Sequence, residues 1–86
     1  MDPEVLSKSQ FYILLEMLRG NILRLHHERY FLFNKETKVF AEKPSSTRTV
    51  DSLKRQDFIA GGTTTFHLTL EGREKIQHEA AAGVFK

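Results

Sequence analysis

The sequence predicts a small α+β domain in which helices and β-hairpins alternate, and three observations support this fold class. Apolar residues recur at helical spacing near the N-terminus, whereas two later stretches are rich in β-branched and aromatic residues. Pro44 and the two serines after it separate two halves, each too short to fold alone. The 86 residues therefore predict one domain over 1–86, in the order helix, β-hairpin, helix, short β-hairpin, helix.

The first predicted element is a helix over 7–19. Ser7 and Gln10 have the Ser-x-x-Gln spacing of a capping box, in which the two side chains satisfy free N–H groups of the first turn. Its core face is predicted to consist of Phe11, Leu14, Leu15 and Leu18. Ile13 and Met17 widen the apolar arc to more than half the circumference, which indicates burial on two sides, by the rest of the domain or by a partner chain.

Strands are predicted over 22–42. The apolar run Ile22–Leu25 is followed by a polar break, and Tyr30–Phe33 has strong strand propensity. Asn34–Thr37 is typical of a four-residue hairpin turn, and Lys38–Ala41 is the predicted return strand. Two or three antiparallel strands are expected here.

A second helix is predicted over 46–57, where Ser45, Ser46 and Thr47 offer N-cap oxygens. Val50 and Leu53 form a narrow apolar seam, so more than half of this helix is polar.

A short hairpin over 58–70 follows. Gly61 and Gly62 are expected to form its tight turn with positive φ, and Phe66 and Leu68 lie on one face of the return strand. The last predicted helix covers 71–82, with Gly83 as its stop.

The segments 49–59 and 66–73 together resemble the second half of winged-helix DNA-binding domains, in particular regulators of the MarR and PadR kind. There, a recognition helix ends in a leucine, a basic pair and an apolar pair, and a β-hairpin wing follows. The segment that closes the wing is matched here by Phe66, Leu68, Thr69, Gly72 and Arg73. The resemblance implies a winged-helix fold with the helix over 46–57 as recognition helix.

The chain departs from this pattern at two places. Gln56 and Asp57 stand where the family has a glycine, and residues 21–44 predict a β-hairpin where the ordinary motif has a positioning helix. The predicted element order is also similar to that of the YjhX-type family of small bacterial proteins, which are candidate toxins.

The charge pattern independently favours DNA binding. The pI of about 9.1 reflects a net charge of only +2. Residues 43–55 hold four basic side chains and one acidic side chain, a net charge of +3, so the remaining residues are together slightly acidic. Arg48 is placed to reach a guanine edge, whereas Lys54 and Arg55 are expected to contact phosphates. The predicted DNA-binding residues are Lys43, Ser45, Ser46, Thr47, Arg48, Thr49, Asp51, Ser52, Lys54, Arg55, Gly62 and Thr63.

The sequence gives little support for a catalytic, metal-binding or membrane-spanning protein. The absence of cysteine excludes a disulfide framework and a Cys-type zinc site. His26 and His27 would point to opposite faces of a strand, so they are not expected to share a metal. We expect no catalytic residues, no metal and no cofactor. The N-terminus is acidic and no apolar run could span a membrane, so a cytoplasmic protein is expected.

The alternative is a non-enzymatic protein-interaction module, which uses the same scaffold to bind a second copy or another protein. Its surface would consist of apolar side chains in excess of what a thin core can bury. The predicted partner residues are Tyr12, Ile13, Met17, Phe31, Phe33, Val84 and Phe85.

Overall fold

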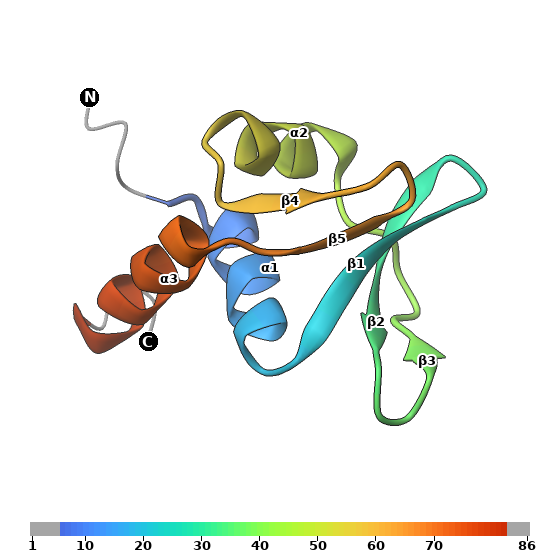
Figure 1. Cartoon of the computed structure of the whole chain (residues 1–86), viewed down its shortest axis with the longest axis horizontal. Helices are drawn as coiled ribbons and strands as arrows, with labels where there is room; N and C mark the ends of the chain where they lie inside the picture. Colours follow the sequence, from blue (N-terminus) through green and yellow to red (C-terminus); the bar gives the residue numbers. More distant parts are fainter. Residues whose placement is uncertain (1–5, 83–86) are drawn as a thin grey trace.

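Three helices and a five-stranded antiparallel sheet form an α+β domain, as the sequence predicts (Figure 1). The computed structural model describes residues 6–82. Its elements are α1 (Lys8–Leu18), β1 (Asn21–His26), β2 (Arg29–Asn34), β3 (Val39–Phe40), α2 (Thr47–Arg55), β4 (Ile59–Gly61), β5 (Thr65–Leu68) and α3 (Leu70–Ala82). The sheet order is β3-β2-β1-β5-β4, so the two hairpins of the chain join into one sheet through β1 and β5.

Helix α1 lies at the centre of the domain. The predicted capping box is present, since Ser7 Oγ accepts from the Gln10 amide at 3.2 Å and Gln10 Oε1 accepts from the Ser7 amide at 2.8 Å. The helix contacts α3 and α2 as well as the inward face of β1, β2 and β5 (Figure 1).

This central position corrects one sequence-based assignment. The sequence predicts Ile13 and Met17 on a partner surface, but they are 3% and 5% exposed and belong to the core of the same chain. The wide apolar arc of α1 is covered within the same chain, because the helix contacts α2, α3 and the strands β1, β2 and β5. Only Tyr12, which is 56% exposed, remains accessible among the partner residues assigned to this helix.

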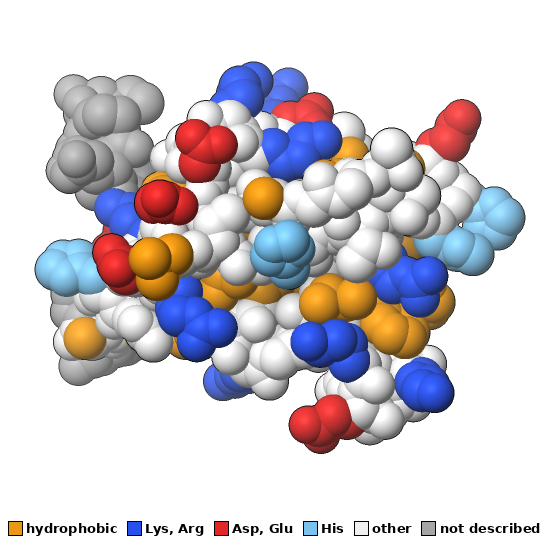
Figure 2. All heavy atoms as spheres, viewed as in Figure 1, with side chains coloured by type: hydrophobic (Ala, Val, Ile, Leu, Met, Phe, Trp, Pro, Cys, Tyr) orange, Lys and Arg blue, Asp and Glu red, His pale blue; other side chains and the backbone are white. Residues whose placement is uncertain are grey.

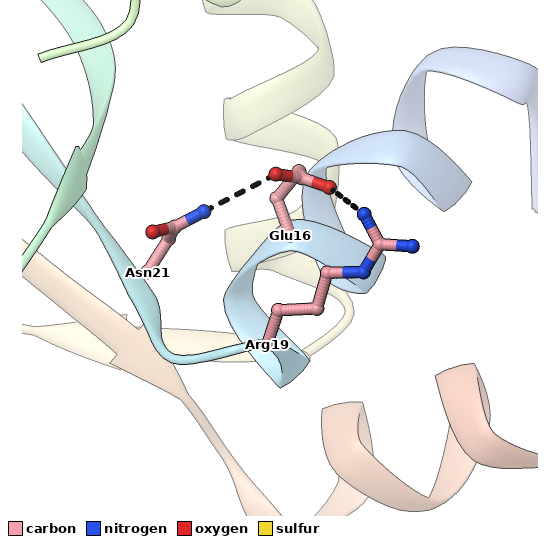
Figure 3. A network of polar contacts seen from close by, with 3 residues as sticks. All are labelled: Glu16, Arg19 and Asn21. Atoms are coloured by element: carbon pink, nitrogen blue, oxygen red, sulfur yellow. Dashed lines mark hydrogen bonds and ion pairs between the residues drawn. The ribbon is translucent and has the colours of Figure 1, made fainter.

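A carboxylate ties the end of α1 to the start of β1. Glu16 accepts from Arg19 Nη1 at 2.9 Å through one oxygen and from Asn21 Nδ2 at 3.2 Å through the other (Figure 3). Gly20 between them has a φ of 109°, a conformation that side-chain-bearing residues rarely adopt. The chain can therefore reverse sharply from the helix into the sheet.

The β1–β2 hairpin sets which side chains face the helices. His26 pairs with Arg29, so only His27 and Glu28 connect the strands, and both have positive φ. Leu23 and Leu32 are directly opposite each other and are 0% and 5% exposed on the inward face. Side chains alternate along a strand, so the neighbouring residues point to the opposite, outward face.

The predicted turn after β2 is present, but it lies one residue later than predicted: Asn34 ends β2, residues 35–38 form the turn, and the return strand is Val39–Phe40 rather than Lys38–Ala41. Asn34 Oδ1 accepts from the amides of Glu36 and Thr37 at 2.9 and 3.1 Å, and Asn34 pairs with Val39. This register aligns Phe33 with Phe40 on the outward face.

The predicted turn at Gly61 and Gly62 is wrong. Gly61 is the last residue of β4 and pairs with Phe66, and neither glycine has positive φ. The reversal falls at Thr63 and Thr64, after a hydrogen bond from the Gly62 amide to the Thr65 carbonyl at 3.1 Å. Glycine is needed at position 61 for a different reason, because a Cβ there would overlap the Thr65 carbonyl oxygen.

The end of α2 and the start of α3 meet at one backbone junction. Asp57, with a φ of 61°, follows the C-cap of α2, and the Phe58 amide donates back to the Leu53 carbonyl at 3.1 Å. Thr69 precedes α3, and its hydroxyl donates to the Asp57 carbonyl and accepts from the Gly72 amide. This junction gives a physical reason for the threonine and the glycine of the closing segment.

Candidate nucleic-acid interface

The buried side of α2 determines which residues face outward. Val50 and Leu53 are both fully buried and anchor the helix to the core. The opposite side is a ridge of Arg48, Asp51 and Arg55, spaced at successive turns. Arg48 and Arg55 are exposed, and the Asp51 side chain between them is 48% exposed. In the following, the outer ridge of α2 means these three residues.

The start of α2 is attached to the sheet. Ser46 is the N-cap, and its Oγ accepts from the Thr49 amide at 3.4 Å. Ser45 donates its amide to the Tyr30 carbonyl at 2.7 Å, which extends the pairing of β2 beyond β3. Lys43 and Thr47 are exposed beside this attachment. The predicted phosphate-binding corner is therefore attached to the sheet, although the Ser46 oxygen already caps the helix.

The sequence predicts that Lys54 contacts phosphate, but in the structure its side chain packs against residues of the sheet. Its ammonium donates to the Tyr30 hydroxyl at 3.3 Å and lies 3.7 Å from Asp51 Oδ1. It also lies over the rings of Tyr30 and Phe66, at 5.6 and 5.1 Å from their centroids. The side chain thus bridges α2 to the sheet. A phosphate contact from Lys54 would have to compete with these interactions.

Ser52 faces α1 rather than the outer side of α2. Its hydroxyl accepts from Gln10 Nε2 at 2.7 Å and lies 3.1 Å from Gln56 Nε2. Ser52 therefore faces Gln10, which belongs to the capping box of α1. Ser52 was assigned to the DNA-binding face, but here it stabilises the contact between the two helices.

The β4–β5 hairpin lies beside α2 and contacts it through β4. Its tip exposes Gly62, Thr63 and Thr64. Residues 59–68 contain no lysine or arginine. The tip can therefore offer hydroxyl and backbone N–H groups, but no cation.

The predicted partner residues fall at separate places. Tyr12 lines a groove of about 500 Å³ with Leu32 and Pro44, between α1 and the segment that leads into α2. Phe31 and Phe33 lie on the outward face of β2 and are half-buried. Val84 and Phe85 lie outside the described residues. Among the described residues, Tyr12 therefore lies on a different surface from Phe31 and Phe33.

The outward sheet face also holds residues that the sequence-based assignment missed. Arg24 on β1 lies 5.0 Å from the Phe33 ring centroid and 5.7 Å from that of Phe40. The rings of Phe33 and Phe40 are 4.8 Å apart. The alternation of the strands and the register of the Asn34 turn predict this alignment, so the signal was present in the sequence.

Residues 6–82 form neither a cluster of metal ligands nor a membrane-spanning helix. Within this range no three histidine or acidic side chains gather into a group that could hold a metal ion. None of the described helices has the length and apolar content that a membrane crossing requires.

Comparison of the chain with protein-family models, with characterised proteins and with solved structures finds no match.

Proposed function

We propose that the protein is a small winged-helix DNA-binding protein that acts in transcriptional regulation, with α2 as its recognition helix. The observation that best supports this is the outer ridge of α2, which presents Arg48 and Arg55 to solvent on a helix anchored by Val50 and Leu53. The major groove of B-DNA admits an α-helix and displays the base edges that such side chains read.

The ridge has dimensions and chemistry suited to the groove. Arg48 and Arg55 are seven residues apart, which corresponds to about 10 Å along the helix axis. Arg48 is nearer the N-terminus of the helix, the end that usually contacts bases, and an arginine binds guanine through two hydrogen bonds. Asp51 between them can accept from the amino group of cytosine. The ridge would then favour a guanine next to a cytosine.

Phosphate contacts would position the helix. Lys43 and Thr47 are exposed on either side of the Ser45 attachment, close to the start of α2. The β4–β5 hairpin takes the place of a wing. Its tip has hydroxyls at Thr63 and Thr64 and no cation, so its contribution would be small. A homodimer would present two copies of α2 to sites about one helical turn apart.

The test is a titration of labelled duplex DNA, of random sequence and of a preferred site selected from it, followed by fluorescence anisotropy between about 50 and 200 mM salt. We expect binding that weakens steeply with salt. Arg48→Ala should cost about 1–3 kcal/mol on a preferred site, and Arg55→Ala should lower the salt slope by about 1.

Arg73→Ala is the matched control, because Arg73 is an exposed arginine on α3 and only its backbone makes a hydrogen bond in the structure. It should bind like the wild type. If the wild type does not bind duplex DNA at low salt, or if Arg73→Ala binds as weakly as Arg48→Ala, the proposal is wrong.

The second candidate is a protein-interaction module, and one observation favours it. Tyr12 is 56% exposed beside the groove lined by Leu32 and Pro44. Tyrosine is enriched at interface centres. Under this alternative, Tyr12→Ala would abolish a protein complex that forms without DNA, and Arg48→Ala would leave it intact.

A further inference from the structure

The outward face of the sheet is free of helices among residues 6–82. The strand residues that are buried in the core with α1 and α2, among them Leu23, Leu32 and Phe66, lie on the inward face. In the view of Figure 2, apolar side chains gather over β1, β2 and β3, next to Lys and Arg side chains. The outward residues of the five strands are Ile22, Arg24, His26, Arg29, Phe31, Phe33, Phe40, Ala60, Thr65 and His67.

Three phenylalanines form the centre of this face. Phe31 and Phe33 alternate on β2, and Phe40 lies beside them on β3, with ring centroids 6.1 Å and 4.8 Å from those of the two β2 residues. His26 stacks on Phe40 at 5.5 Å. All three phenylalanines are only half-buried although they pack against one another, because nothing described lies above them. These three phenylalanines form what we call the aromatic face.

The charges around the aromatic face are mainly positive, although Glu28 in the β1–β2 turn and Glu36 in the β2–β3 connection are also exposed. Arg24 and Arg29 occupy outward positions, and no aspartate or glutamate does so on any of the five strands. Lys35 and Lys38 are exposed in the connection between Phe33 and Phe40, where Glu36 is the one acidic residue. None of the chain's 11 acidic residues lies in one of the five described strands, on either face of the sheet. A polyanion would find cations here and no opposing carboxylate in the strands.

We propose that the aromatic face binds single-stranded nucleic acid, with unpaired bases stacked on the phenylalanine rings and phosphates near Arg24, Arg29, Lys35 and Lys38. Stacked aromatic residues beside a basic groove are how proteins bind single strands without reading their sequence. Residues two apart on a strand are about 6.7 Å apart, which leaves room for about one base on each of Phe31 and Phe33. This site is separate from the outer ridge of α2 and does not depend on the proposed function.

Arg24 is also suited to binding a single strand. Its guanidinium lies over the rings of Phe33 and Phe40, a contact that is weak where solvent can reach it. The planar group can therefore move aside for a base, or cover a base that has entered between it and the ring. A protein partner that covered the face would have to bury Arg24 without a carboxylate from this face to pair with it.

The experiment measures binding of labelled dT12 by fluorescence anisotropy at about 50 mM salt, with the full chain. We expect saturable binding that weakens with salt. Phe31→Leu and Phe33→Leu keep apolar side chains on the sheet and should each weaken binding about 5- to 100-fold. Tyr12→Leu is the matched control, since it removes an exposed aromatic ring from α1, and it should bind like the wild type.

A second variant separates stacking from an indirect effect on the fold. The chain has no tryptophan, so Phe31→Trp introduces a single tryptophan on the aromatic face. It should retain binding, and its fluorescence should be quenched when dT12 is added. Circular dichroism should show that each variant is folded at the temperature of the titration.

The results that would overturn the proposal are distinct from those that concern α2. They are no binding of dT12 at low salt, equal losses in Tyr12→Leu and Phe33→Leu, or a dimer that Phe33→Leu dissociates and that does not bind dT12. Arg48→Ala should leave dT12 binding within about twofold. If Arg48→Ala instead removes binding to dT12 and to duplex DNA equally, the single strand binds at α2 and the aromatic face has no such role.

Discussion

Asp57 has the backbone conformation of a glycine at the point where α2 leads into β4. Its φ is 61°, and the two hydrogen bonds that close the helix, from the Asp57 and Phe58 amides, require this conformation. The carboxylate also lies at the C-terminal end of the helix, where the macrodipole disfavours negative charge. Position 57 is thus strained although the fold around it is well packed.

Asp57→Gly should therefore stabilise the domain by about 0.5–1 kcal/mol, or roughly 2–6 °C in Tm. Thermal unfolding followed by circular dichroism measures this. Gln56→Gly is the control, because Gln56 has a φ of −88° and gains nothing from glycine, so that change should lower Tm. A lower Tm for Asp57→Gly would show that the carboxylate makes a stabilising contact in solution.

Gly72 illustrates the opposite case, a helical glycine that an alanine should not replace. A Cβ at this position would overlap the Phe58 carbonyl oxygen and lie 3.0 Å from Leu68 Cδ1. The backbone of Phe58 cannot retreat easily, because its carbonyl accepts from the Thr69 amide at 3.0 Å. Close approach of α3 to the chain after α2 therefore depends on glycine.

Gly72→Ala should destabilise the domain by about 2–3 kcal/mol, although alanine normally stabilises a helix relative to glycine. Urea denaturation of the purified variant provides the measurement. Gly62→Ala serves as the comparison, since a Cβ there would have no neighbour within 4 Å. It should stay within about 0.5 kcal/mol of the wild type. Equal effects of the two changes would disprove the packing argument.

The β1–β2 hairpin is closed by a turn whose residues do not match its geometry. His27 and Glu28 have φ values of 51° and 64°, the pattern of a two-residue turn that asparagine and glycine prefer. The double change His27→Asn and Glu28→Gly should raise stability by about 1 kcal/mol in thermal or urea unfolding. The same residues placed at Lys35 and Glu36, where φ is not positive, should give no gain. A gain there as large as at the turn would mean that the effect is not conformational.

How much of each element the sequence predicts depends on whether its determinants are local. The predicted capping box of Ser7 and Gln10 is confirmed, and the turn after β2 is displaced by only one residue, because the determinants of each lie within a few neighbouring residues. The β4–β5 turn is misplaced because the requirement for Gly61 comes from the carbonyl of Thr65 across the hairpin. The sequence alone shows only a glycine pair.

In the candidate DNA-binding helix, too, local determinants are predictable and those distant in sequence are not. Val50 and Leu53 identify its buried side, so the outward positions of Arg48 and Arg55 follow from helical geometry. The positions of Ser52 and Lys54, on the flanks of the helix, cannot be predicted from helical geometry alone. Ser52 binds Gln10 of α1, and Lys54 lies on rings of the sheet, because of how the helix packs against residues far along the chain.

The whole domain is closed by a contact between its first and last described segments. Glu79 on α3 is 6% exposed, and its Oε1 accepts from the Leu6 amide at 3.4 Å across 73 positions of sequence. Lys75 lies 3.5 Å from the same oxygen, and its side chain is 18% exposed. Leu6, next to the cap of α1, is itself buried, so this carboxylate links α3 to the entry of the central helix.

Glu79→Leu should cost about 1–3 kcal/mol, because the Leu6 amide and the Lys75 ammonium would lose their partner in a largely buried setting. For 86 residues the total stability is expected to be only about 4–13 kcal/mol, so the loss is measurable by urea denaturation. Glu79→Gln keeps an acceptor for the amide and should cost less than about 1 kcal/mol. If Glu79→Leu is as stable as the wild type, the ion pair contributes nothing beyond its desolvation cost, as happens for many buried pairs. The link between the ends of the described chain would then rest on the packing of Leu6 alone.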